Sequence, residues 1–147
     1  MSEPPIFPPG LHPVDEAQLD THFLHAFSAS ATRPLLLSGL RAFLAALRRV
    51  GVAFEVWLDG SFCTHKVDPN DVDLVVFADA AALNGLPPMQ QAYLRGLLDR
   101  ASAKRLFGCD VLFAPAGDAN MRSYWRGWYG FDRLEQPKGI AQITVGP

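Results

Sequence analysis

The amino-acid sequence predicts an α+β domain, in which helices pack against a small mixed β-sheet. Three observations predict this fold class. Residues 35–50 carry apolar side chains at helical spacing, whereas residues 52–58, 71–77 and 109–113 are short runs rich in β-branched and aromatic side chains. The loop between the first two runs is short, which suits antiparallel strands, and the connection to the third is long and helical, which suits a parallel crossover.

The composition is that of one globular domain. The chain has 147 residues, of which 49% are hydrophobic and 19% charged, so a long disordered chain or an acidic tail is excluded. Its 13 basic and 15 acidic residues give a net charge of −2, which argues against a protein that coats nucleic acid. Two cysteines are too few for a disulfide scaffold or a cysteine-rich zinc site.

The first thirteen residues hold five of the twelve prolines. Such a density excludes a helix or a central strand, so we predict an extended N-terminal arm over residues 1–13 and a single domain over residues 14–147. The N-terminus lacks a basic segment followed by an apolar run, and no stretch reaches the roughly 18 apolar residues of a membrane helix. We therefore expect a cytoplasmic protein that does not contact a membrane.

The elements of the first half follow in order. Residues 14–29 have apolar side chains at roughly helical spacing and predict a short helix. Pro34 suits the first turn of the helix over residues 35–50, and Gly51 suits its end. The strand over residues 52–58 leads into a loop, because the segment DGSFCTHKVDPN is rich in turn residues.

The second half begins with the strand DVDLVVF over residues 71–77. We expect one helix after it, with a proline pair near its start and its end near residue 104, and then the strand CDVLF over residues 109–113. The remaining segment, residues 117–147, has no predicted element. It gathers aromatic and basic side chains: Tyr124, Trp125, Arg126, Trp128, Tyr129, Phe131, Arg133 and Lys138.

Three aspartates at strand ends are the main chemical feature. Asp71 and Asp73 are two residues apart on one strand, so both side chains leave the same face with Cβ atoms about 7 Å apart. Two such carboxylates repel each other, and Mg²⁺ makes the pair favourable because it prefers hard oxygen ligands. Asp110 begins the third strand and would lie beside them if the two strands are parallel. Three carboxylates are sufficient for a site of two Mg²⁺ ions.

A structural explanation of the aspartates stays open. Asp71 can cap a turn, and Asp73 can be an ordinary charge at the edge of a strand. The pair Gly60-Ser61 favours the functional explanation, because it directly follows a strand. A glycine there lets the backbone approach a phosphate closely, and the serine hydroxyl and nearby N–H groups can bind it.

These residues resemble a known signature. Leu58, Gly60 and Ser61, followed after nine residues by Asp71-Val72-Asp73-Leu74, are similar to the pattern hydrophobic–Gly–(Gly/Ser)–x9–13–Asp–h–Asp–h of the DNA polymerase β-like nucleotidyltransferase superfamily. Asp110 resembles the third carboxylate of that superfamily. The strings PPGLHP, DGSFCTHKVDPNDVDLVVF and WRGWYGFDR…PKGIAQI are similar to a small family of standalone, uncharacterised bacterial nucleotidyltransferase-like domains.

The resemblance implies a minimal polymerase β-like fold and a reaction. Asp71 and Asp73 would hold Mg²⁺ on the triphosphate of an NTP, and Asp110 would bind the metal nearest the acceptor or act as a base toward its hydroxyl. Gly60 and Ser61 would hold the β- and γ-phosphates. The acceptor would attack the α-phosphorus in line, so that NMP is transferred and pyrophosphate is released.

Other side chains near this signature have two explanations each. Lys66 can bind a phosphate oxygen as a point charge, or it can be a solvated loop lysine. His65 is expected to be exposed, and Asp59 to hydrogen-bond the turn. A zinc site on the two cysteines and His65 has too few ligands. The aromatic and basic residues of 117–147 form either a lid over the nucleotide or a cover for the open face of the sheet.

The sequence therefore predicts an Mg²⁺-dependent nucleotidyltransferase with an unidentified acceptor. Because 147 residues leave little room for a separate acceptor domain, we expect a macromolecule that brings its own recognition surface, such as a co-encoded partner protein. The resemblance suggests a toxin–antitoxin or phage-defence setting. A small-molecule acceptor stays open, and nucleic acid is disfavoured by the charge. The alternative is a non-catalytic nucleotide-binding or interaction module that retains the fold.

Overall fold

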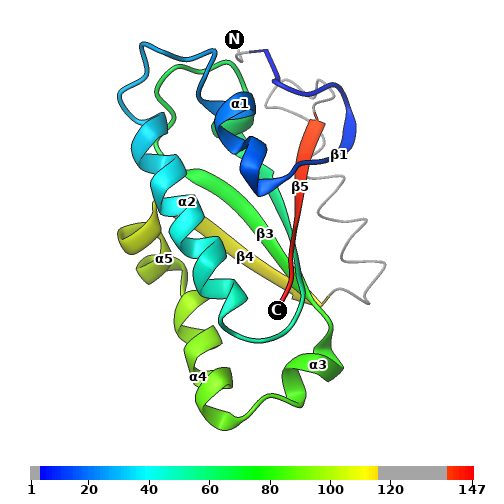
Figure 1. Cartoon of the computed structure of the whole chain (residues 1–147). Helices are drawn as coiled ribbons and strands as arrows, with labels where there is room; N and C mark the ends of the chain where they lie inside the picture. The colour runs from blue at the N-terminus through cyan, green and yellow to red at the C-terminus, as the bar shows by residue number, and fades with distance from the viewer. Residues whose placement is uncertain (1–3, 116–138) are drawn as a thin grey trace.

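A computed structural model of the chain describes residues 4–115 and 139–147. The described residues form a five-stranded mixed sheet with helices packed on it, which confirms the predicted α+β class (Figure 1). The strand order is β1-β5-β2-β3-β4. The strands are Gly10–Pro13 (β1), Phe54–Asp59 (β2), Val72–Ala78 (β3), Cys109–Pro115 (β4) and Gly139–Val145 (β5).

The pairing of the three predicted strands is confirmed. β2 and β3 are antiparallel, and β3 and β4 are parallel. β5 was not predicted; it pairs antiparallel with β2, and β1 pairs parallel with β5. The last part of the proline-rich segment is therefore an edge strand, where a proline such as Pro13 is tolerated because one side of the strand needs no ladder hydrogen bonds.

The helices differ from the prediction in extent and number. Only Leu19–Phe23 of the first expected helix is α-helical, after a 3-10 turn at Glu16–Gln18. The helix predicted to end near residue 104 is divided, and Asp99 begins its last part by accepting a hydrogen bond from Ser102 N (3.0 Å). The α-helices are Leu19–Phe23 (α1), Arg33–Arg48 (α2), Ala80–Asn84 (α3), Pro88–Leu97 (α4) and Arg100–Phe107 (α5).

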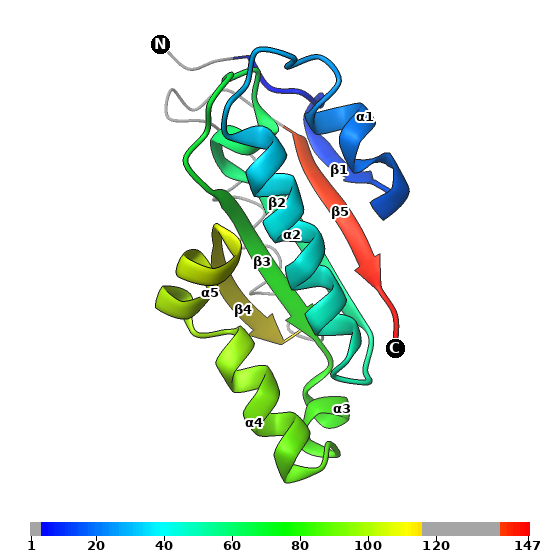
Figure 2. The same cartoon turned by 60° about the vertical axis from the view of Figure 1, so that its left-hand side comes forward.

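The sheet has two apolar faces. α2 lies along one face, where its buried leucines and Phe43 pack against alternate strand residues such as Val56 and Leu74 (Figure 2). The intervening residues form a second buried cluster on the other face, which includes Trp57, Val75 and Phe77. Since side chains alternate along a strand, residues 73 and 110 point to this second face.

Two further predictions concern the C-terminal segment and membrane insertion. The aromatic and basic residues of 124–138 lie outside the described residues, and so does their predicted role as a lid or a cover. Within the described ranges, no helix combines the length and the apolar character needed to cross a lipid bilayer.

Candidate metal and nucleotide site

The three predicted aspartates meet at one end of the central strands. Asp71 directly precedes β3, and Asp73 on β3 is the register partner of Asp110 on β4. One carboxylate oxygen from each lies within 4.8 Å of the others, and all three residues are half-buried. The expectation that parallel strands bring Asp110 beside Asp71 and Asp73 is confirmed.

The Gly60-Ser61 turn lies against this cluster. β2 ends at Asp59, which is the register partner of Asp73, and a short 3-10 helix, Gly60–Cys63 (η2), follows at once. Gly60 has a φ of +74°, and a Cβ atom there would lie 2.1 Å from Asp73 Oδ2. Glycine is therefore required for two reasons, the left-handed backbone and the close approach of the carboxylate. The structure thus places the turn and the acids together.

A buried arginine fixes the loop that continues from this turn. The Arg33 side chain at the start of α2 is 0% exposed. Its guanidinium donates to the main-chain carbonyls of Phe62 (3.0 Å), Thr64 (2.7 Å) and Lys66 (2.8 Å) and stacks at 3.8 Å over the ring of Phe27. Burial lowers the pKa of Arg33 from its ordinary value. The loop therefore has its shape set by the fold itself.

The contacts of Lys66 involve its main chain. Its carbonyl accepts from Arg33, and its N–H donates to Thr64 Oγ1 (3.2 Å), whereas the residue as a whole is exposed. The structure thus fixes where the Lys66 backbone lies and leaves the ammonium in solvent. His65 is also exposed, as expected, with its ring centroid 5.7 Å from that of Phe27.

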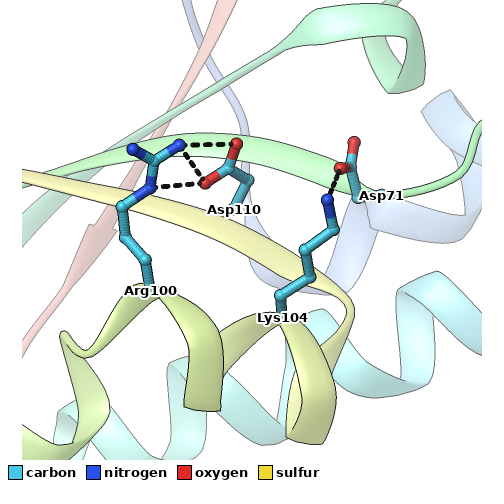
Figure 3. A network of polar contacts seen from close by, with 4 residues as sticks. All are labelled: Asp71, Arg100, Lys104 and Asp110. Carbon is cyan, nitrogen blue, oxygen red and sulfur yellow. Dashed lines mark hydrogen bonds and ion pairs between the residues drawn. The ribbon is translucent and has the colours of Figure 1, made fainter.

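Two cations on α5 face the acid cluster, and neither was predicted from the sequence. Arg100 donates from Nε to Asp110 Oδ1 (3.0 Å) and from a terminal nitrogen to Oδ2 (3.2 Å), while Lys104 Nζ lies 3.3 Å from Asp71 Oδ2 (Figure 3). The two cations are four residues apart, so they lie on one face of the helix. That spacing, on the helix directly before the third aspartate, was the signal available in the sequence.

Two more groups border the cluster. Asp59 is 2% exposed and lies opposite Asp73 across the β2–β3 pair, so the acidic character extends further than predicted.

Burial and, to a lesser degree, the charge of Asp71 raise the pKa of Cys109 to about 12. Its thiol therefore stays protonated at neutral pH and offers no thiolate ligand. Cys63 is likewise a buried free cysteine, which leaves the cluster as an oxygen site.

The donor set fits a hard divalent cation. Mg²⁺ binds oxygens at about 2.1 Å, so ligands on one ion lie roughly 3–4 Å apart. The carboxylate oxygens of the three acids need only small rotations from their 4.8 Å limit to reach that spacing. All three remain partly exposed, so an ion and a phosphate can reach them. The residues Asp71, Asp73 and Asp110 would be the ligands.

Comparison with known proteins gives the family of the chain and no activity. No curated protein and no solved structure matches it. A family model described as a family of unknown function (DUF6932) matches residues 1–144, which is nearly the whole chain. The acid cluster, the Gly60 turn and the α5 cations all lie within the matched residues. The chain belongs to the DUF6932 family, whose function is unknown.

Proposed function

We propose that this protein is an Mg²⁺-dependent nucleotidyltransferase that transfers NMP from an NTP to an acceptor hydroxyl and releases pyrophosphate. One observation carries the proposal: Asp71, Asp73 and Asp110 converge beside a glycine turn, where a Cβ atom on Gly60 would lie 2.1 Å from Asp73 Oδ2. A reaction on a metal-bound triphosphate requires backbone N–H groups that can bind phosphate next to carboxylates that can bind the metal. The likeness of the motif to the polymerase β-like superfamily and its minimal fold supports the same reaction.

Each residue has a defined task in this proposal. Asp71 and Asp73 hold the metal that neutralises the triphosphate. Gly60 and Ser61 bind the β- and γ-phosphates through N–H groups and the serine hydroxyl, and Lys66 adds a positive charge. Bound Mg²⁺ supplies charge neutralisation for the leaving pyrophosphate.

Asp110 lies on the acceptor side of the reaction. It accepts the proton of the acceptor hydroxyl or binds the second metal ion there. The acceptor oxygen then forms a bond to the α-phosphorus as the bond to the pyrophosphate oxygen breaks, in line with the attack. Positioning and charge neutralisation supply most of the catalysis.

The acceptor is proposed to be a macromolecule, such as a hydroxyl of a co-encoded partner protein in a toxin–antitoxin or phage-defence setting, within the cytoplasm. The net charge of −2 disfavours nucleic acid as the acceptor. A small-molecule acceptor is the other source of the same hydroxyl. The gene neighbourhood tests this part directly, because a co-encoded protein would be the first acceptor to try.

The test is label transfer from α-labelled NTPs. Wild-type protein, Mg²⁺ and each NTP are incubated with cell lysate, and labelled products are separated. We expect Asp73→Asn to lower labelling by a factor on the order of 10³, because it removes a metal ligand that acts in the transition state. Asp79→Asn is the matched control, since Asp79 lies beyond the opposite end of β3 and asparagine still caps α3. No labelling by wild type, or equal labelling by Asp73→Asn, refutes the proposal.

A second candidate is a non-catalytic nucleotide-binding or interaction module. The ion pairs of α5 favour it, because they give Asp71 and Asp110 a structural role without any metal. Calorimetry with Mg·NTP separates the candidates. A module without nucleotide binding gives no heat, a binding module gives heat without turnover, and the proposed enzyme gives both.

A further inference from the structure

The cations of α5 occupy carboxylate oxygens that the proposed function needs for metal. We infer that Arg100 and Lys104 are exchangeable counter-ions: they hold Asp110 and Asp71 in the metal-free protein and bind phosphate oxygens once a divalent cation takes their place. Metal and triphosphate would then bind together rather than separately. This inference rests on the proposed function and concerns how its site is filled.

Competition for the same oxygens is the first argument. Arg100 contacts both Oδ1 and Oδ2 of Asp110, and Lys104 contacts Asp71 Oδ2. A guanidinium that bridges both oxygens of a carboxylate lies where a metal bound to that group would lie. An Mg²⁺ ion therefore has to displace the arginine, and the free energy of its ion pair is subtracted from metal binding.

Exposure is the second argument, because it shows that both cations can leave. The Arg100 and Lys104 side chains are 63% and 62% exposed, whereas their carboxylate partners are 27% and 21% exposed. Ion pairs with one partner so well solvated contribute little stability, and the long side chains keep their rotamer freedom. A released cation remains next to the site on its flexible side chain.

The helix that carries the two cations is held in place. The Phe107 carbonyl of α5 approaches Gly39 of α2 so closely that a Cβ atom there would lie 2.1 Å from it. The other end of α5 is capped by the Asp99 side chain. The two cations therefore project from a helix that packs closely on α2, on the face of α5 nearest the acids.

Phosphate is the chemical partner that suits the released cations. The planar fork of arginine matches the oxygens of a phosphate as well as those of a carboxylate, and lysine binds phosphate as a point charge. A triphosphate brought in with the metal supplies such oxygens where the carboxylates have just been taken. After the exchange the metal faces the carboxylates and the two cations face the phosphate, so each released cation keeps an anionic partner.

The test measures two affinities in the Arg100→Gln/Lys104→Gln double variant. Binding of Mn²⁺ alone is followed by the paramagnetic resonance of the free ion, and binding of the Mg²⁺ complex of inorganic tripolyphosphate by calorimetry. We expect Mn²⁺ to bind about three- to tenfold more tightly than to wild type, and the tripolyphosphate complex to bind more weakly by a similar factor. A purely structural role of the two residues would not move the two affinities in opposite directions.

Arg105→Gln is the matched control, because Arg105 is an exposed cation on the same helix whose electrostatic partner is Asp99. It should change neither affinity. Unchanged or weaker Mn²⁺ binding by the double variant overturns the inference. If both affinities move as expected while wild type transfers no NMP, the inference stands and the proposed reaction fails. If Asp73→Asn binds Mn²⁺ as tightly as wild type, the acids are not the metal site and both fail.

Discussion

Two arginines show how differently the two sides of the candidate site are built. Arg33 is fully buried, donates to main-chain carbonyls of η2 and of the loop after it, and stacks on Phe27. Arg100 is largely exposed and pairs with one carboxylate, that of Asp110. The first arginine is part of the core, and the second is a solvated partner of the acids.

The difference teaches which part of the site is fixed and which is exchangeable. A buried guanidinium that leaves these carbonyls exposes buried acceptors without a partner, which costs free energy, so Arg33 holds the turn and loop from Gly60 to Lys66 in place. An exposed ion pair can dissociate at little cost. The turn side of the candidate site is therefore set by folding, whereas the acid side carries exposed ion pairs, and these are the contacts that the proposed metal would replace.

The largest loss of stability is expected when the contacts between Arg33 and the loop are removed. Arg33→Met should lower the free energy of unfolding by about 3–5 kcal/mol, because it leaves several buried carbonyls without donors and removes packing against Phe27. Arg33→Lys should recover only part of this, since lysine lacks the planar fork. Urea denaturation measures both. A loss below about 1 kcal/mol for Arg33→Met would show that the loop does not depend on this arginine.

The contact between turn and acids can be broken at Gly60. Gly60→Ala should cost about 2–4 kcal/mol of unfolding free energy, because the new Cβ meets Asp73 Oδ2 in addition to the left-handed strain. Gly51→Ala is the matched control: Gly51 also has a positive φ, +96°, but a Cβ atom there would meet nothing within 4 Å among the described residues. Its loss should be about 1 kcal/mol. Equal losses in the two variants, measured by urea denaturation, would show that the approach of Asp73 is unimportant.

The stability of the protein should depend on pH through Cys109, the buried residue directly before Asp110. The pKa of Cys109 is raised from 9.0 to about 12, so the folded protein keeps a proton that the unfolded chain loses. This contribution to stability is complete below about pH 9 and is lost as the pH rises toward about 12. Wild type should lose about 1 kcal/mol more than Cys109→Ala between about pH 9 and about pH 10. Parallel profiles for the two proteins would contradict the burial of this thiol.

The smallest loss of stability is expected when an exposed ion pair between α5 and the acids is removed. Arg100→Gln should change the free energy of unfolding by less than about 1 kcal/mol, because the ion pair with Asp110 is exposed. The measurement is the same urea titration used for Arg33. A loss as large as that of Arg33→Met would mean that Arg100 is a structural residue, and the contrast between the two sides would disappear.

Local pattern predicted much of the framework. The strands around residues 54–59, 72–78 and 109–115 and the helix α2 follow from apolar periodicity, and the position of Asp110 follows from the parallel crossover. The division of the long helix was missed, because Asp99 reads as one polar residue among others until its cap to Ser102 is seen. β5 was missed although its sequence, GIAQITV, carries β-branched residues and follows a proline, because this segment was interpreted through its aromatic and basic side chains.

The contacts that tie the site together were beyond sequence reasoning. Arg33 lies at a helix start, and three of its carbonyl partners, those of Phe62, Thr64 and Lys66, are 29 to 33 residues away, so no local pattern connects them. Asp59 was assigned to the turn, but its place opposite Asp73 depends on the exact antiparallel register. The four-residue spacing of the α5 cations shows that they share a helix face, but which face of α5 lies toward the acids depends on how the helix packs on the sheet.

The central claim is that the three aspartates bind a divalent cation beside the Gly60 turn. A crystal structure with Mg²⁺ and a non-hydrolysable NTP tests it most directly. We predict a metal about 2.1 Å from carboxylate oxygens of Asp71, Asp73 and Asp110, with the triphosphate against Gly60 and Ser61. A nucleotide bound elsewhere, or aspartates that keep their α5 partners with no metal at saturating Mg²⁺, would contradict the claim.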